Sequence, residues 1–76
     1  MEKLTSRKNE YIRALRRLSA EGQFRAERGE YICDGIKTLN EALAFGADVT
    51  SVLWKERAQP VPGLSCAVQY AAGEEL

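Results

Sequence analysis

Histidine is absent from this 76-residue sequence, and cysteine, proline, methionine and tryptophan are each present only once or twice. Without histidine the chain has no ordinary Ser-His or Cys-His pair and no imidazole general base. Cys33 and Cys66 lie far apart and lack Cys-x-x-Cys spacing, which argues against a zinc site. We therefore predict no metal site, and two reduced thiols in an intracellular chain, with a single disulfide as the alternative.

Long apolar runs and phosphate-binding glycine motifs are missing as well. No run approaches the roughly 18 apolar residues of a membrane span, and the charged start Met1-Glu2-Lys3 leads into no signal-peptide core. Neither Gly-x-Gly-x-x-Gly nor a Walker-type loop is present. We therefore predict a cytoplasmic chain with no membrane partner and with no cofactor of its own.

The chain is also too short for most complete enzymes, which usually need domains of roughly 100–150 residues. Its 11 Lys and Arg balance 11 Asp and Glu, and a net charge of zero argues against a nucleic-acid binder. The charges are nevertheless unevenly placed. Residues 1–28 hold eight Lys/Arg and four Glu, net +4, whereas residues 29–76 hold three Lys/Arg and seven Asp/Glu, net −4. The neutrality is a cancellation between two halves.

An amphipathic helix is predicted from the caps Thr5 and Ser6 to about Ser19. Its apolar stripe comprises Leu4, Tyr11, Leu15 and Leu18, bordered by Ile12 and Ala14. Its opposite face carries Asn9, Arg13 and Arg16, with Ser6 and Arg17 beside them. We expect Gly22 to end this helix and residues 23–29 to form a polar connector.

A compact βαβ unit is predicted next. The apolar run 30–33 reads as a strand, and Asp34 can cap a helix whose stripe is Ile36, Leu39 and Leu43. Gly46 stands where a left-handed residue ends a helix, and the β-branched and apolar run 50–54 indicates a second strand. Two parallel strands joined by a right-handed crossover follow from this order.

The last third of the chain gives weaker signals. Prolines and a glycine predict a loop over residues 58–63, and residues 64–70 can supply a third strand. Residues 73–76 resemble the first turn of a helix, with acidic residues at the positive end of the helix dipole. We therefore expect the chain to be a piece of a longer protein.

The basic helix face carries most of the chemistry. Its arginines, joined by Arg25 and Arg28, can contact phosphates, while Asn9 can hydrogen-bond a base edge or a sugar. The alternative is a solvated face with salt bridges, because Glu10 lies near Lys8 and Arg13 in the sequence. Acidic residues elsewhere are expected at the surface or as a cap, and Tyr11 and Trp54 in the core. We assign no catalytic residue.

The order of residues resembles one family. Ser6-Arg7-Lys8-Asn9 precedes a hydrophobic helix, Arg25 and Gly29 follow, and Tyr31 leads into Asp34-Gly35-Ile36-Lys37 and Glu41-Ala42-Leu43. This order is similar to the N-terminal substrate-binding domain of the SpoU/TrmH RNA ribose 2′-O-methyltransferases, from about Leu4 to Trp54. Two departures are Asp34, where the family usually has Glu, and the short proline-containing region after Trp54.

The resemblance implies a fold and a function for residues 1–76. The fold would be a small three-layer α/β domain with a mostly parallel sheet, akin to the ribosomal proteins that bind kink-turn RNA. Its role would be to recognise rRNA or tRNA as the substrate of a methyltransferase. That enzyme would be a homodimer, and its knotted C-terminal domain would bind S-adenosylmethionine and carry the catalytic residues. The expected RNA-binding residues are Asn9, Arg25 and Lys37 from the resemblance, and Arg13, Arg16, Arg17 and Arg28 from the charge pattern.

Two other functions fit the same residues. The chain could be a free-standing RNA-binding module of the kink-turn type, with no enzymatic partner. It could also be a protein-interaction or dimerisation domain whose basic helix face docks on an acidic partner. RNA binding and its salt dependence distinguish these functions.

Overall fold

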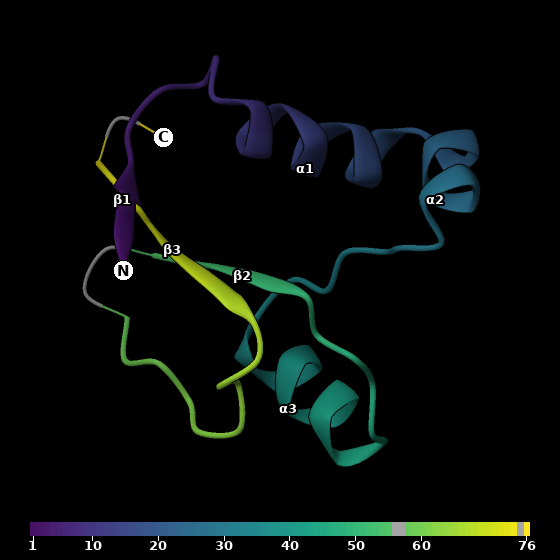
Figure 1. The fold of residues 1–76 in the computed structure, drawn as a ribbon, viewed down its shortest axis with the longest axis vertical. Helices are drawn as coiled ribbons and strands as arrows, with labels where there is room; N and C mark the ends of the chain where they lie inside the picture. Colours follow the sequence, from purple (N-terminus) through teal and green to yellow (C-terminus); the bar gives the residue numbers. More distant parts are fainter. Residues whose placement is uncertain (56–57, 75) are drawn as a thin grey trace.

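Three short strands form a parallel sheet of order β1-β3-β2, drawn in Figure 1. They are β1 (Glu2–Leu4), β2 (Ser51–Trp54) and β3 (Val68–Ala72). The central strand, β3, pairs with both others, so that Leu4 lies opposite Ala72 and Trp54 opposite Ala71. The first strand of the chain therefore joins the sheet beside the last one.

The computed structural model describes residues 1–55, 58–74 and 76. Its three helices are α1 (Glu10–Ala20), α2 (Gly22–Arg28) and α3 (Ile36–Ala44). The predicted α/β class with a parallel sheet is confirmed. The three-layer arrangement and the likeness to kink-turn-binding proteins stay predictions. Over the described ranges, no helix combines the length and the apolar character that a membrane crossing requires.

The buried core is small and joins the sheet to α1. It consists of Leu4, Ile12, Leu18, Trp54 and Leu64. The indole Nε1 of Trp54 donates to Oε1 of Gln69 at 3.0 Å, and Nε2 of Gln69 donates to the carbonyl of Leu64 at 3.3 Å. The predicted core position of Trp54 is confirmed, and its one polar atom is satisfied as burial requires.

The first helix begins later than the sequence predicts. Asn9 is its N-cap: the side-chain Oδ1 accepts from the backbone N–H of Tyr11 at 2.8 Å and of Ile12 at 3.3 Å. Ser6 Oγ accepts from the N–H of Lys8 at 3.1 Å, in the turn before the helix. The prediction of Leu4 on the helical stripe is wrong, because Leu4 pairs with Ala72 of β3 and lies in a strand.

The polar connector predicted for residues 23–29 is wrong, because residues 22–28 form α2. Gly22 begins this helix, and Glu21, with an extended backbone, separates it from α1. Good helix formers such as Gln23, Arg25 and Ala26 favour the helical state. The helix ends at Gly29, whose φ of 63° is the left-handed conformation that glycine adopts at little steric cost.

The strand predicted at residues 30–33 is wrong in this structure, and with it the βαβ unit. Tyr31 and Ile32 are 69% and 41% exposed, and residues 31–34 have no regular secondary structure. Local β propensity does not make a strand without hydrogen bonds from a neighbouring strand. The third strand of the sheet is instead β1, which lies at the edge opposite β2 and is a charged segment with no such propensity.

The helix predicted after residue 34 is confirmed as α3, but its cap is different. Gly35 occupies the N-cap position, and none of the described side chains, that of Asp34 included, makes a capping hydrogen bond. Gly46 has a φ of 78°, as predicted, and its N–H donates to the carbonyl of Leu43 while that of Ala47 donates to Ala42. These two bonds are the Schellman pattern that satisfies the last carbonyls of a helix.

The strand predicted at 50–54 is confirmed as β2, and the one predicted at 64–70 lies slightly later, as β3. Residues 58–63 have no regular secondary structure, in agreement with the predicted loop. The predicted helical turn at residues 73–76 includes Glu75, which lies outside the described residues; the N–H of Leu76 donates to the carbonyl of Gly73 at 3.2 Å.

Candidate nucleic-acid interface

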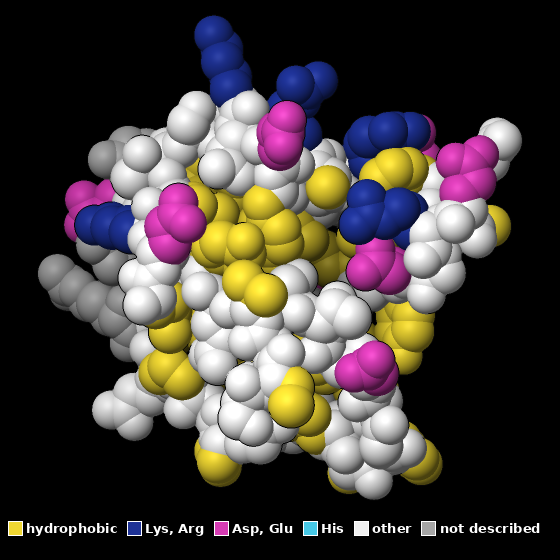
Figure 2. Space-filling model, in the orientation of Figure 1, with side chains coloured by type: hydrophobic (Ala, Val, Ile, Leu, Met, Phe, Trp, Pro, Cys, Tyr) yellow, Lys and Arg dark blue, Asp and Glu magenta, His cyan; other side chains and the backbone are white. Residues whose placement is uncertain are grey.

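The predicted basic surface lies on the helical part of the molecule. On the face shown in Figure 2, most of the dark-blue Lys and Arg side chains lie along the upper edge, over α1 and α2, and a hydrophobic area lies beside them. Arg13, Arg16 and Arg17 belong to α1, while Arg25 and Arg28 belong to α2. The two helices therefore present five of the seven predicted RNA-binding residues.

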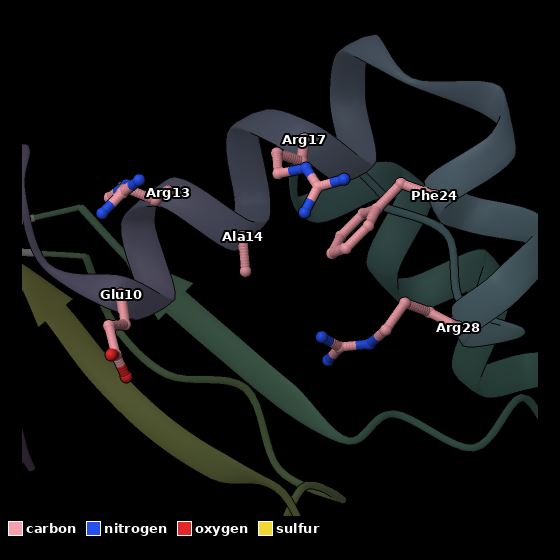
Figure 3. Close-up of a pocket in the computed structure, with 6 residues that line it drawn as sticks. All are labelled: Glu10, Arg13, Ala14, Arg17, Phe24 and Arg28. Atoms are coloured by element: carbon pink, nitrogen blue, oxygen red, sulfur yellow. The ribbon is translucent and has the colours of Figure 1, made fainter.

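A shallow cleft lies between α1 and α2, with a volume of about 270 Å³. It is lined by Glu10, Arg13, Ala14, Arg17, Phe24 and Arg28 (Figure 3). The residues on α1 follow one face of that helix at spacings of three and four. Three of the predicted arginines thus share one concave surface, which we call the arginine cleft.

Phe24 organises one end of the arginine cleft. Its ring lies between the guanidinium groups of Arg17 and Arg28 in Figure 3. The guanidinium carbon of Arg17 is 3.9 Å from the ring centroid, and that of Arg28 is 5.4 Å from it. Both distances are within the roughly 6 Å reach of a cation–π interaction. The ring therefore holds two positive groups close together, despite their mutual repulsion.

Each of these two arginines also pairs with a carboxylate. Arg17 donates from Nε and Nη2 to the Glu21 carboxylate, both at 3.2 Å, and Arg28 donates from Nε to Oε1 of Glu30 at 3.0 Å. All four side chains are partly exposed, at 30–54%. Exposed pairs of this kind contribute only about 0–1 kcal/mol. A competing phosphate can replace such a carboxylate at little cost.

Arg13 and Arg16 have no such partners. Within residues 1–55, 58–74 and 76, neither guanidinium makes a hydrogen bond or an ion pair. Both residues are exposed on α1. The salt-bridged face considered as the alternative is present only in part, because Glu10 does not pair with Arg13. These two positive charges are available to a polyanion.

Two predicted RNA-binding residues, Asn9 and Arg25, also make structural contacts. Nη1 of Arg25 donates to the carbonyl of Leu18 at 2.6 Å and to that of Ser19 at 3.3 Å, so it satisfies acceptors at the end of α1. The carbonyl oxygen of Asn9 is occupied by its capping bonds. These contacts leave less hydrogen-bonding capacity for RNA at both positions than the sequence suggests.

Lys37 lies in the first turn of α3, which is on the opposite side of the molecule from α1 in Figure 1. It does not line the arginine cleft. Conversely, sequence reasoning missed Phe24 as an organising residue, because it placed Phe24 in a connector. The i, i+4 spacing of Arg17 with Glu21, and of Phe24 with Arg28, is the signal that a helical interpretation would have used.

Tyr11 connects this helical surface to the sheet. Its hydroxyl donates to Oγ of Ser51 at 3.0 Å, and its ring centroid lies 4.5 Å from that of Tyr70. Burial raises the pKa of the Tyr11 phenol above its ordinary value, and the hydrogen bond with Ser51 partly opposes this. Tyr11 was predicted in the core, but it is only half-buried; its contacts pack α1 against β2 and β3.

The described part of the chain was also compared with the requirements of a metal site and a disulfide. No group of three His, Cys, Asp or Glu residues there is arranged to hold a metal ion, and both cysteines are free thiols. Comparisons with known protein families, with curated proteins and with solved structures found no match to this chain. The function must therefore be argued from the surface itself.

Proposed function

We propose that this chain is an RNA-binding domain that uses the exposed face of α1 and α2. The observation that carries the proposal is the pair Arg13 and Arg16, two exposed guanidinium groups on one helix without a partner among the described side chains. Arg17 and Arg28 lie beside them with only weak surface pairs. Planar guanidinium groups suit phosphate recognition because they donate several hydrogen bonds in a fixed geometry.

The order of residues described above extends this proposal to an enzyme. Its resemblance to the SpoU/TrmH substrate-binding domain suggests that the RNA is the substrate of a ribose 2′-O-methyltransferase. In that case S-adenosylmethionine and the catalytic groups belong to another domain of the protein. The likeness to kink-turn-binding proteins, and a part for Asn9, Arg25 and Lys37 in binding, belong to the same proposal.

Neutralising the two unpartnered arginines tests the proposal. Fluorescence anisotropy with a labelled 12-nucleotide uridine RNA would compare the native chain with Arg13→Gln/Arg16→Gln. We expect the double variant to bind about tenfold more weakly, since two charge-assisted contacts are lost. The matched control is Gln59→Glu/Ser65→Glu, which lowers the net charge by the same two units at exposed positions between β2 and β3. Equal losses in both variants would contradict a binding role for α1.

One observation favours a different function. Large apolar side chains are exposed near α3: Ile36 is 48% exposed, Phe45 89% and Tyr31 69%. Exposed apolar side chains that gather in a patch are typical of protein-interaction surfaces. A protein-interaction or dimerisation domain would self-associate in sedimentation velocity experiments and would not change the anisotropy of the labelled RNA. RNA binding by a monomer would instead exclude this alternative as the main function.

A further inference from the structure

The arginine cleft is large enough for one small group but not for an extended strand. Its volume of about 270 Å³ lies just below the roughly 300–1,000 Å³ of typical ligand pockets. Ala14 forms part of its surface and contributes only a methyl group, which leaves the space between α1 and α2 open (Figure 3). A single nucleotide unit of an RNA chain matches this size.

Free hydrogen-bond donors of Arg17 and Arg28 lie at the Phe24 end of the cleft, while those of Arg13 lie at the other end (Figure 3). Arg17 uses Nε and Nη2 for Glu21, and Arg28 uses only Nε for Glu30. The Nη1 group of Arg17 and both Nη groups of Arg28 make no other hydrogen bond with the described residues. Cation–π contact with Phe24 holds both guanidinium groups in place before any ligand arrives. This end of the cleft is suited to a phosphate.

The opposite end has a different character. Glu10 lies away from Phe24 in Figure 3, and its carboxylate can only accept hydrogen bonds. Arg13 lies at the same end, so these two side chains together carry no net charge and can both accept from and donate to a hydroxyl group. The cleft therefore suits a ligand with an anionic group at the Phe24 end and a neutral, hydrogen-bonding group at the other end. A nucleotide has this arrangement, because its phosphate is followed by ribose hydroxyls.

We propose that the arginine cleft binds one nucleotide unit, with the phosphate at Arg17 and Arg28 and the ribose toward Glu10. This inference rests on the proposed RNA-binding function and adds a defined site to it. A general basic surface attracts anions in proportion to their charge. The arginine cleft, by contrast, selects for the distribution of charge within the ligand, and this difference can be measured.

Three small probes distinguish the two cases: uridine 5′-monophosphate, uridine and inorganic pyrophosphate. NMR would follow the Nε–H signals of the arginines in the full 76-residue chain during titration. We expect uridine monophosphate to shift the Arg17 and Arg28 signals at a lower concentration than the more highly charged pyrophosphate does, and uridine to shift neither. Tighter binding of pyrophosphate, or equal shifts at Arg16, would overturn the site.

Matched variants locate the effect. Arg17→Gln and Arg16→Gln remove the same charge from the same helix, but only Arg17 lines the cleft. We expect the Arg17 variant to lose at least about fivefold in affinity for uridine monophosphate and the Arg16 variant less than about twofold. Glu10→Gln should strengthen pyrophosphate binding and so reduce the preference for uridine monophosphate over pyrophosphate. Equal losses from Arg17→Gln and Arg16→Gln would contradict the proposal.

The outcomes separate this inference from the proposed function. If the uridine RNA binds and is weakened by Arg13→Gln/Arg16→Gln, while the cleft signals do not respond to uridine monophosphate, the RNA-binding function stands and the nucleotide site is wrong. If the cleft binds uridine monophosphate but the chain binds no RNA, the proposed function fails and the site is that of a small nucleotide.

Discussion

The helical unit and the sheet of this molecule use their side chains in different ways. The sheet is held by apolar burial around Trp54, with one satisfied polar contact to Gln69. The α1–α2 unit has only Ile12 and Leu18 in the core and is closed by a charged contact from Arg25 to the end of α1. Arg25 thus contributes to the fold, whereas Arg13 and Arg16 make no comparable contact with the described residues. A count of arginines overstates the binding surface.

Removing Trp54, the largest buried side chain of the sheet, should have the largest effect. Trp54→Ala should lower the free energy of unfolding by about 3–5 kcal/mol, a large part of the stability of a domain of this size. Because an isolated helix as short as α1 is marginal in water, its helical signal should be lost together with the sheet. Urea unfolding followed by circular dichroism measures both. In the native chain, helical signal that outlasts the change in Trp54 fluorescence during urea unfolding would show that the two regions are independent.

The same substitution should lower the free energy of unfolding at Arg25 and leave it nearly unchanged at Arg13. Arg25→Gln should lower the free energy of unfolding by about 1.5–3 kcal/mol, because a charged hydrogen bond to the Leu18 carbonyl is lost. Arg13→Gln should change stability by less than about 0.5 kcal/mol, as expected for an exposed residue with no hydrogen bond or ion pair to the described residues. Urea unfolding tests stability, and anisotropy with uridine RNA tests binding. A greater loss of stability in the Arg13 variant would contradict the division between fold and surface.

The contrast between these arginines shows how far the sequence alone leads. Local patterns correctly predict α3, β2 and the left-handed Gly46, because apolar spacing and a helix stop act within a few residues. They do not predict β1, whose strand state depends on pairing with residues almost 70 positions away. They also cannot tell which arginine turns inward, since Arg25 is chemically identical to Arg13.

The Tyr11 contact that joins the two regions should make stability depend on pH. The pKa of Tyr11 is raised in the folded state by burial. Its contribution to stability is therefore fully present below the unfolded pKa of about 10 and is lost as the pH rises through the higher folded value. Tyr11→Phe should lower the free energy of unfolding by about 1 kcal/mol at neutral pH through loss of the Ser51 hydrogen bond. The substitution should also reduce the loss of stability that the native chain shows at alkaline pH.

Urea unfolding at several pH values between neutrality and the alkaline range measures this dependence. Tyr70→Phe is the matched control, because it removes a phenol hydroxyl from the ring that packs against Tyr11. If the free energy of unfolding of Tyr11→Phe decreased at alkaline pH as much as that of the native chain, the role given to Tyr11 would be contradicted.

The surface pair at the edge of the arginine cleft should have the smallest effect on stability. Glu30→Gln should change the free energy of unfolding by no more than about 1 kcal/mol, because the pair with Arg28 is partly exposed. Affinity for uridine RNA should rise slightly, since the substitution removes a competing negative charge. Weaker binding in this variant would show that Glu30 positions Arg28 instead of competing for it.

The dependence of RNA affinity on salt tests the central claim most directly. If about three arginines of the α1–α2 surface contact phosphates, the logarithm of the association constant for uridine RNA should fall against the logarithm of salt concentration with a slope of about −2. Arg13→Gln/Arg16→Gln should reduce this slope by about 1.4. A slope near zero, or the same slope in the double variant as in the native chain, would contradict RNA recognition by this surface.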